Sequence, residues 1–353
     1  MSESFINKKT AVVLFNLGGP DKLESVEPFL FNLFYDPAII RLANPWRWLV
    51  AKLISKLRKR KAQQIYALIG GKSALTEVTE SQRLSISQKL NQLAAEGEFE
   101  VFVSMRYWSP RIDEVLKQIE DYEPQQIILM PLYPQFSTTT TESSLKEFEQ
   151  TKTKFPKLKF IPIKTICCYY NNYHFVQSHC LLIKEAIAAM KSDNYRILFS
   201  AHGIPTKIIS NGGDPYQWQV EQTVDIVVNN LKINNLDYKL SYQSRATPVE
   251  WLTPDTEHEI KIACQQGKAL ILVPIVFVSE HVETLVELDI EYKAIADKAG
   301  IIYSRVPALG ISDTFINSIS NMLISFAKND HKMICNSEGI SCPRKFFACP
   351  SNI

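Results

Sequence analysis

The sequence predicts an α/β protein made of two similar lobes, each a parallel sheet flanked by helices. Short apolar or β-branched runs alternate with longer helix-like segments, which is the pattern of parallel strands joined by crossover helices. The second half of the chain repeats short motifs of the first half in the same order. At 353 residues the chain is also long enough for two such lobes.

Four strands are expected in each half of the chain. In the first half they cover residues 11–17, 99–105, 126–132 and 158–163. In the second half they cover residues 196–201, 238–244, 269–275 and 301–306. Most of these runs are continuously apolar, as expected for strands that are covered by helices on both faces.

The internal repeat sets the expected domain boundaries. VSMRYWSP matches YQSRATP, and ILMPLYPQFSTTTTESS matches ILVPIVFVSEHVETL, at a separation of about 140 residues. We therefore expect a first lobe over residues 1–165, a second lobe over 166–330, and a cysteine-containing tail over 331–353. Ligands of such sheets bind beyond the carboxyl ends of the strands, which favours a site in the cleft between the lobes.

The composition is that of an ordinary soluble protein. A net charge of +2 with 22% charged residues gives no overall reason to bind nucleic acid. The N-terminus lacks the pattern of a secretory signal, and no apolar run reaches the roughly 18 to 20 residues of a membrane span. We expect a cytoplasmic protein, in which seven cysteines indicate buried thiols or metal ligands rather than a disulfide framework.

Two glycine-rich stretches fail as nucleotide-binding motifs. NLGGP has adjacent glycines and a proline where a dinucleotide fold needs G-x-G-x-x-G. GGKS ends like a phosphate-binding loop, but Tyr66 stands where the first glycine of that motif is required. Neither stretch supports NAD or ATP binding.

His202 is a candidate proton acceptor. It ends an expected strand in SAHGIP, before Gly203 and Pro205, where the chain must turn and a side chain can face a cleft. Its ordinary pKa of about 6.5 suits proton transfer near neutral pH. The alternative is a structural histidine that only makes hydrogen bonds.

Three glutamates, Glu283, Glu287 and Glu291, follow the expected strand 269–275 at intervals of four residues. On a helix they share one face, and like charges at this spacing cost a few tenths of a kcal/mol per pair. A solvated helix face is one interpretation. The other is a row of oxygen ligands that replaces the waters of a divalent cation step by step.

Six motifs together resemble the signatures of the ferrochelatase family, in that family's order: LFNLGGP, SMRYWSP, YPQFSTTTTESS, SAHGIP, YQSRATPVEWLTP and VPIVFVSEHVETLVELDIEY. The resemblance covers residues 10–325. It implies a chelatase-like fold of two Rossmann-like lobes and a lyase that inserts Fe²⁺ into protoporphyrin IX, forming protohaem in the terminal step of haem biosynthesis. A coproporphyrin ferrochelatase, a cobaltochelatase, and a non-catalytic tetrapyrrole- or metal-binding protein stay open as alternatives.

The resemblance also assigns roles to individual residues. His202 and Glu283 become the catalytic pair, and with Glu287 and Glu291 they become the metal-binding residues. Substrate-binding positions fall on Arg106, Tyr107, Ser137, Gln243, Trp251 and Phe277. Metal insertion removes two pyrrole protons and strips water from Fe²⁺, so an imidazole and carboxylates suit the reaction. For each aromatic residue, simple core packing is the alternative.

Residues 46–61, WRWLVAKLISKLRKRK, form the candidate membrane-facing lip, which spans 40–61. On a helix the apolar residues Trp46, Leu49, Val50, Leu53, Ile54 and Leu57 fall near one face. Lys52, Lys56 and the cluster 58–61 add positive charge, as in helices that lie on anionic membranes. A helix packed on its own lobe is the alternative. The resemblance places this lip at the pocket and favours peripheral contact with the inner membrane face; a homodimer is a further candidate assembly.

The cysteines of the tail are candidate ligands of an iron–sulfur cluster. Cys335, Cys342 and Cys349 lie within fifteen residues, and the resemblance suggests that they hold a [2Fe–2S] cluster. A cluster held by thiolates needs a fourth donor, for which Cys167 or Cys168 is favoured ahead of Cys180. The spacing is wider than is usual in the family, so a zinc site or a free reduced tail stays open.

Overall fold

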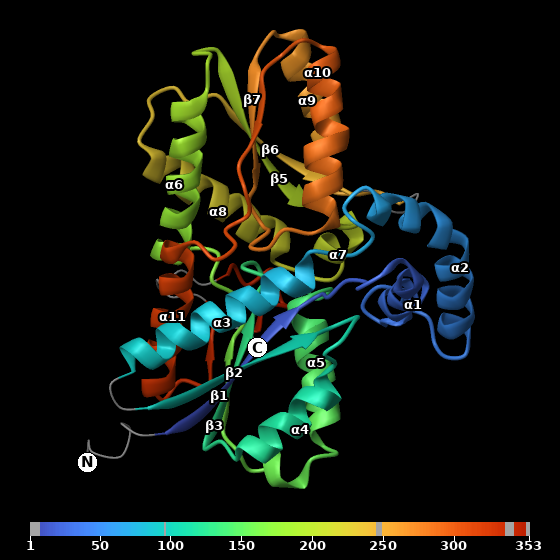
Figure 1. The fold of residues 1–353 in the computed structure, drawn as a ribbon, viewed down its shortest axis with the longest axis vertical. Helices are drawn as coiled ribbons and strands as arrows, with labels where there is room; N and C mark the ends of the chain where they lie inside the picture. Colours follow the sequence, from blue (N-terminus) through green and yellow to red (C-terminus); the bar gives the residue numbers. More distant parts are fainter. Residues whose placement is uncertain (1–7, 95–96, 245–248, 336–341, 351–353) are drawn as a thin grey trace. The chain divides into compact units, whose positions relative to one another are not determined.

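The computed structural model describes residues 8–94, 97–244, 249–335 and 342–350 (Figure 1). The chain forms two compact units. Unit 1 contains the chain up to residue 133, residues 137–168 and residues 316–335. Unit 2 contains residues 134–136, 169–315 and the C-terminal tail. Each unit is a parallel sheet with flanking helices, so the predicted α/β class is confirmed.

Unit 1 is built on a five-stranded parallel sheet in the order β2-β1-β3-β4-β9. Its strands are β1 (Lys9–Asn16), β2 (Glu98–Met105), β3 (Gln126–Pro131), β4 (Ile163–Ile166) and β9 (Met333–Ile334). Its helical segments are η1 (Leu23–Ser25), α1 (Val26–Tyr35), α2 (Trp46–Ala67), α3 (Leu75–Leu93), α4 (Ile112–Tyr122), α5 (Thr141–Lys152) and η2 (Pro156–Leu158). The central strand β1 is buried along almost its whole length, as its apolar run predicts.

The core of unit 1 follows from helical periodicity. In α4 the apolar residues Ile112, Val115, Leu116 and Ile119 share one face, and all four are buried. This face packs on one side of the sheet together with Phe148 of α5, whose ring meets Phe15 of β1 edge to face.

Unit 2 is built on a four-stranded parallel sheet in the order β6-β5-β7-β8. Its strands are β5 (Tyr195–His202), β6 (Tyr238–Gln243), β7 (Ala269–Pro274) and β8 (Tyr303–Arg305). Its helices are α6 (Tyr173–Ala189), α7 (Thr206–Ser210), α8 (Tyr216–Leu231), α9 (Thr256–Gln265), the π-helix η3 (Glu283–Tyr292) and α10 (Lys293–Lys298), and α11 (Asp313–Lys328) leads into unit 1. In Figure 1, α6 and α8 lie on one side of this sheet and α9 and α10 on the other.

The two sheets share one strand order, which agrees with the predicted internal repeat. In each sheet the first strand of the unit lies between the second and the third, and the fourth pairs with the third. The observed limits of the strands and units differ from the predicted ones in two places. The fourth strand of unit 1 begins at Ile163 rather than near residue 158, because Pro156 starts a 3₁₀ turn there. Residues 316–335 belong to unit 1, where β9 adds an edge strand, although the sequence placed residues up to 330 in the second lobe.

The described part of the tail, residues 342–350, packs on unit 2. Cys342, Phe346 and Cys349 are buried against Ile209 and Trp218. The amide of Ala348 also donates a hydrogen bond of 3.2 Å to the carbonyl of Gly213. The tail is thus docked beside the loop that follows β5.

The helices of the described residues offer no candidate for a membrane span, since none is both long enough and apolar enough to cross a bilayer.

Candidate active site

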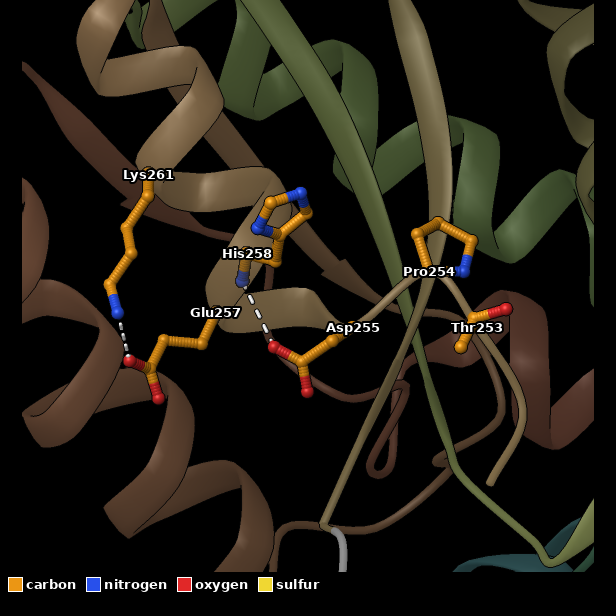
Figure 2. A pocket seen from close by; sticks show the side chains of 6 residues that line it. All are labelled: Thr253, Pro254, Asp255, Glu257, His258 and Lys261. Carbon is orange, nitrogen blue, oxygen red and sulfur yellow. Dashed lines mark hydrogen bonds and ion pairs between the residues drawn. The ribbon is translucent and has the colours of Figure 1, made fainter. Parts of the chain in front are cut away.

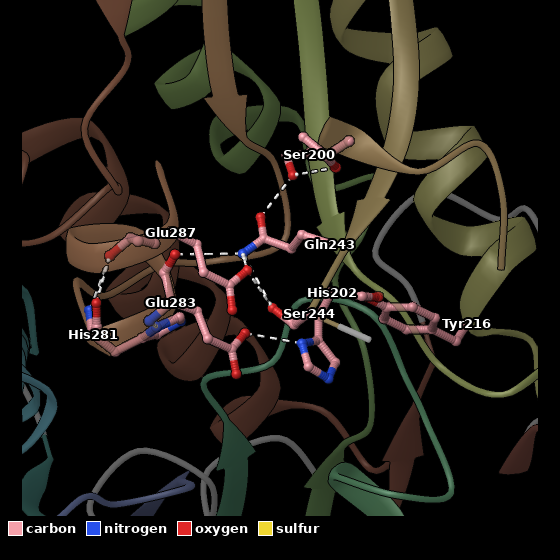
Figure 3. Close-up of polar contacts among 10 residues, drawn as sticks. Ser200, His202, Tyr216, Gln243, Ser244, His281, Glu283 and Glu287 are labelled. Atoms are coloured by element: carbon pink, nitrogen blue, oxygen red, sulfur yellow. Dashed lines mark hydrogen bonds and ion pairs between the residues drawn. The ribbon is translucent and has the colours of Figure 1, made fainter. Parts of the chain in front are cut away.

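His202 and Glu283 meet at the carboxyl end of the unit 2 sheet (Figure 3). His202 is the last residue of β5, and Glu283 is the first residue of the π-helix that follows β7. Their side chains are joined by a 2.9 Å contact between Nδ1 of His202 and Oε2 of Glu283. Two motifs that lie far apart in the sequence therefore bring their side chains into contact, and the catalytic role of the two residues stays a prediction.

The helix that carries the glutamates is a π-helix over Glu283–Tyr292, not the α-helix that an i, i+4 pattern suggests. A run of π-helix is rare, and such turns occur often at functional sites. Glu283 and Glu287 are half-buried and engaged in contacts on this helix, whereas Glu291 is exposed. The three carboxylates predicted as one row thus have different surroundings.

Glu287 is held by neutral donors. The hydroxyl of Ser244 donates to its Oε2 at 2.7 Å, and Nε2 of Gln243 donates to the same oxygen at 3.2 Å. Gln243 is fully buried, and its Oε1 accepts a 2.6 Å hydrogen bond from Ser200. Since Gln243 pairs in register with His202 across β5 and β6, it links the histidine strand to the glutamate helix.

The two glutamates have opposite pKa shifts. Burial raises the pKa of Glu283, but the charge and hydrogen bond of His202 outweigh burial and bring the pKa to about 2. Burial, followed by the nearby charge of Glu283, raises the pKa of Glu287 to about 7. At neutral pH the first carboxylate is therefore ionised, and the second can gain or lose a proton.

His202 is also tuned by this arrangement. Burial lowers its pKa, but the charge of Glu283 and the hydrogen bond to it outweigh burial, so that the pKa lies above its ordinary value. The hydroxyl of Tyr216 donates to the His202 carbonyl at 2.9 Å and fixes the backbone. In the neutral ring Nδ1 carries the proton toward Glu283, and Nε2 has no hydrogen-bond partner among the described residues. Nε2 is thus the atom that can accept a proton.

Three supporting residues were not predicted from the sequence: Ser244, Tyr216 and His281. Nδ1 of His281 accepts a 3.0 Å hydrogen bond from the amide of Glu283, and its ring lies edge to face with Phe277 at 4.5 Å. Ser244 adjoins Gln243 in the motif YQSRATP, and His281 lies two residues before Glu283, so proximity to the predicted residues was the available signal.

Arg106 and Tyr107 belong to a buried polar network in unit 1. Arg106 contacts Asp36 at 2.8 Å and Glu147 at 2.9 Å, and its Nε donates to Ser143. The hydroxyl of Tyr107 donates to Asp36 at 2.9 Å, and Tyr107 is only 1% exposed. Both side chains are thus engaged within unit 1, and their predicted role in substrate binding stays a prediction.

The other predicted substrate residues are scattered between buried and half-buried positions. Ser137 is buried, and its hydroxyl lies 2.9 Å from that of Thr139. Trp251 and Phe277 are half-buried in unit 2. Trp251 forms a bridge with Pro205, which follows His202 closely, and the ring of Phe277 lies edge to face with His281, which precedes Glu283 closely. Both aromatic residues therefore contact residues next to the predicted pair.

The candidate cluster cysteines are divided between the two units. Cys167 and Cys335 are joined by a disulfide in unit 1, and the thiol of Cys168 donates to the Cys335 carbonyl. Cys342 and Cys349 lie in unit 2, where Nε2 of Gln219 donates to the Cys342 sulfur at 3.2 Å. Throughout the described ranges, no three His, Cys, Asp or Glu side chains form a group that could hold a metal ion.

The predicted lip is an exposed apolar surface on α2. The buried positions of this helix include the small residues Ala51 and Ser55, whereas large apolar side chains face outward. The exposed fractions are 66% for Trp46, 48% for Leu49, 59% for Leu53 and 72% for Leu57. Lys52 and Lys59 form ion pairs with Glu27 of α1, which leaves Arg60 and Lys61 among the exposed cations.

A separate depression of about 450 Å³ lies at the start of α9 (Figure 2). It is lined by Thr253, Pro254, Asp255, Glu257, His258 and Lys261. Asp255 caps the helix by accepting a hydrogen bond from the His258 amide, and Lys261 pairs with Glu257. These contacts give Asp255, Glu257 and Lys261 a structural role in α9. None of the predicted site residues lines this depression.

Known proteins match this chain over almost its whole length. The sequence profile of the family described as ferrochelatase matches residues 9–326. The ferrochelatase of Rickettsia bellii (strain OSU 85-389) is 56% identical over 348 residues, which cover 98% of this chain and 96% of that protein. The ferrochelatase of Pelagibacter ubique (strain HTCC1062) is 48% identical over 345 residues, or 97% and 98% of the two chains.

A solved structure shows the same fold. SirB from Bacillus subtilis with Fe³⁺ aligns with a TM-score of 0.53 over 91% of this chain and 96% of that chain, at 13% identity. The sequence matches confirm the resemblance that the six motifs predicted, and on their identity and coverage the chain belongs to the ferrochelatase family.

Proposed function

We propose that this chain inserts Fe²⁺ into protoporphyrin IX and so forms protohaem, the last step of haem synthesis. Membership of the ferrochelatase family makes the chain an enzyme of the lyase class. The observation that carries the proposal is the 2.9 Å contact between His202 and Glu283 at the carboxyl end of the sheet. A carrier of tetrapyrroles needs at most a ligand for the metal, whereas metal insertion needs groups that take up protons.

The reaction releases two pyrrole protons as the iron enters the ring. In our proposal Nε2 of neutral His202 takes the first proton, and ionised Glu283 stabilises the resulting imidazolium through Nδ1. Glu287, whose pKa burial raises to about 7, takes the second proton. Exposed Glu291 then offers a carboxylate through which hydrated Fe²⁺ reaches the inner pair or through which protons leave.

The half-buried aromatic residues supply binding energy for a flat apolar substrate. Trp251 and Phe277 lie between His202 and Glu283 in the sequence, and each is partly accessible. Contacts of this kind could hold the macrocycle distorted and expose its nitrogens, which stabilises the transition state relative to the planar ring.

Anaerobic incubation of the purified protein with Fe²⁺ and protoporphyrin IX tests the proposal. The free-porphyrin absorption bands should collapse to the spectrum of a metalloporphyrin at a rate far above that without protein. Parallel reactions with coproporphyrin III and with Co²⁺ distinguish the two related chelatases. Binding of porphyrin without metal insertion in any arm would refute the catalytic role.

We further propose that α2 docks the protein on an anionic membrane surface. Over residues 46–57 the helix exposes large apolar side chains, and its buried positions there are the small residues Ala51 and Ser55. This is the reverse of a helix whose apolar face serves only its own core. Exposed cations flank this apolar surface, and an apolar porphyrin partitions into lipid. Together these features support peripheral binding at the inner face of the membrane. A homodimer stays a prediction.

The [2Fe–2S] cluster also stays a prediction. It requires Cys335 to be free of its bond to Cys167 and to join Cys342 and Cys349 in one donor set. Anaerobically purified protein that contains about two iron and two sulfide ions per chain, both lost in Cys342→Ser, would support it. Colourless, active protein without sulfide would eliminate it.

A further inference from the structure

Two side chains of β8 contact the segment that carries the glutamates. Tyr303 and Arg305 alternate along β8 and so point to the same face of the sheet, where the π-helix packs. The hydroxyl of Tyr303 donates a 2.7 Å hydrogen bond to the carbonyl of Leu288, in the middle of the π-helix. A side chain that bonds a carbonyl inside a helix is a recognised cause of departure from α-helical winding.

Arg305 joins two points of this segment that lie nine positions apart in the sequence. Its Nη1 contacts Oε1 of Glu280 at 2.5 Å, just before the π-helix. Its Nε and Nη2 form a fork on the carboxylate of Asp289 at 2.7 and 2.6 Å, within the π-helix. Because the guanidinium is planar and the contact with Asp289 is bidentate, the contact fixes both the position and the orientation of the Asp289 carboxylate relative to β8.

Glu280 extends this contact to the start of the helix. Its Oε2 accepts a 2.5 Å hydrogen bond from the hydroxyl of Thr284, and its Oε1 accepts one of 2.9 Å from the amide of Ala308. Thr284 in turn accepts a 3.0 Å hydrogen bond from the amide of His281. Burial raises the pKa of Glu280, but the charge of Arg305 outweighs it, so this carboxylate stays ionised.

The winding of this segment decides where Glu283 lies. An α-helix turns by about 100° per residue and a π-helix, at roughly 4.4 residues per turn, by about 82°. Over the six residues from Glu283 to Asp289 the difference amounts to about 110°. With Asp289 held, α-helical winding would therefore swing Glu283 away from His202, and the 2.9 Å contact depends on the π form.

Stability alone does not account for these contacts. Arg305 is only 13% exposed, and a buried ion pair is often no more stabilising than an apolar replacement of similar size. In some proteins buried ionic groups serve to fix one geometry, and we take this role as the hypothesis for Arg305.

We propose that Tyr303 and Arg305 are positioning residues that hold Glu283–Tyr292 in the π-helical register and so place Glu283 and Glu287 beside His202 and Ser244. The inference rests on the proposed metal insertion for its catalytic consequence, but the register itself is a property of the folded chain. In this role each side chain acts through the glutamates, since both contact the segment that carries them.

The test compares Arg305→Met, Arg305→Lys and Tyr303→Phe with the control Lys293→Met. Lys293 forms an exposed ion pair with Asp297 just beyond the π-helix, so its substitution removes a cation without touching the register. Two experiments are made on each variant: steady-state kinetics, which give kcat and KM for metal insertion, and hydrogen–deuterium exchange of the amides in 283–292.

Arg305→Met should lower kcat by about tenfold or more with an unchanged KM for the porphyrin, and exchange in 283–292 should become faster. Arg305→Lys, which keeps the charge but loses the fork, should recover part of kcat, and Tyr303→Phe should show a smaller loss. Lys293→Met should match the wild type.

The proposal is overturned if the wild type is active and both kcat and local exchange in Arg305→Met and Tyr303→Phe equal those of the control. An inactive wild type would refute the proposed function instead. The exchange of the amides in 283–292 would then still show whether Tyr303 and Arg305 hold the π-helix. Should Arg305→Met fail to fold, Tyr303→Phe, which lacks one hydroxyl, decides alone.

Discussion

The hydroxyl of Ser244 lies 2.7 Å from the carboxylate of Glu287 and donates to it. One helical turn away, Glu283 contacts His202, which can carry a positive charge. Two glutamates four residues apart on one helix thus have different partners. The partner of Glu287 is the neutral Ser244, and that of Glu283 is the ionisable His202. The contrast separates their protonation at neutral pH, since the pKa of Glu283 is lowered and that of Glu287 is raised.

Glu287→Gln should stabilise the protein at high pH. Burial and then the charge of Glu283 raise the pKa of Glu287 from 4.5 to about 7, so the folded state binds this proton more tightly than the unfolded chain. Ionisation of Glu287 therefore destabilises the folded state. This effect is absent below pH 4.5, grows as the pH rises to about 7 and is complete above that pH. Thermal unfolding should therefore show a higher Tm for Glu287→Gln than for wild type at about pH 8, and little difference at about pH 4.5.

Glu291→Gln is the matched control for this measurement, because Glu291 is exposed on the same helix. It should leave Tm unchanged at both pH values. A Tm difference for Glu287→Gln that is the same at both pH values would contradict the assigned pKa shift.

The His202–Glu283 pair should stabilise the fold mainly at mildly acidic pH. The raised pKa of His202 gives a contribution that is complete below 6.5 and is lost as pH rises through the folded-state pKa. The lowered pKa of Glu283 gives a second stabilising contribution, which is complete above pH 4.5 and is lost as the pH falls toward about 2. In a double-mutant cycle of His202→Ala and Glu283→Gln, the coupling energy should be larger at about pH 5.5 than at about pH 9. Equal coupling at both would show that the contact involves no protonated histidine.

The fold was largely predictable because parallel strands that are buried on both faces leave continuous apolar runs in the sequence. Seven of the eight expected strands overlap an observed one by several residues, and only the run 158–163 barely reaches β4. Strand β9 was missed because two paired residues leave no periodic signal. Its place at the sheet edge depends on tertiary contacts that the sequence does not reveal.

The candidate site was predictable in its residues but not in its geometry. His202, Glu283 and Gln243 stood out because each ends a strand or follows one closely. The π-helix could not be read from an i, i+4 spacing that an α-helix also produces, and it depends on contacts from β8. Likewise nothing in SMRYWSP shows that Tyr107 is buried against Asp36, seventy-one residues earlier in the chain.

Removal of the exposed cations of α2 should weaken binding to anionic vesicles. Arg58→Gln, Arg60→Gln and Lys61→Gln in one variant should reduce flotation with phosphatidylserine-containing liposomes, and added salt should reduce wild-type binding, because surface charges are screened. The control replaces Lys154, Lys157 and Lys159, which are also exposed, and removes the same net charge. Equal loss in both variants would mean that net charge, and not the α2 surface, directs the protein to the membrane.

Gly213→Ala should release the tail from unit 2. Gly213 has a φ of +62°, and an added Cβ would lie 2.6 Å from the ring of Phe347 in the tail. Gly267→Ala is a matched control, since its φ is +63° but nothing lies within 4 Å of an added Cβ. Both should lose about 1 kcal/mol or more from the left-handed backbone, but only Gly213→Ala should expose the tail to limited proteolysis. Identical cleavage in the two variants would show that the Phe347 contact does not hold the tail.

Turnover of Glu283→Gln and His202→Ala, measured anaerobically with Fe²⁺ and protoporphyrin IX alongside porphyrin binding, tests the central claim most directly. The pair accepts a proton and stabilises the charge that results, so each substitution should lower kcat by about 10²-fold or more while the porphyrin Kd stays near that of the wild type. A kcat close to that of the wild type in either variant would contradict the account.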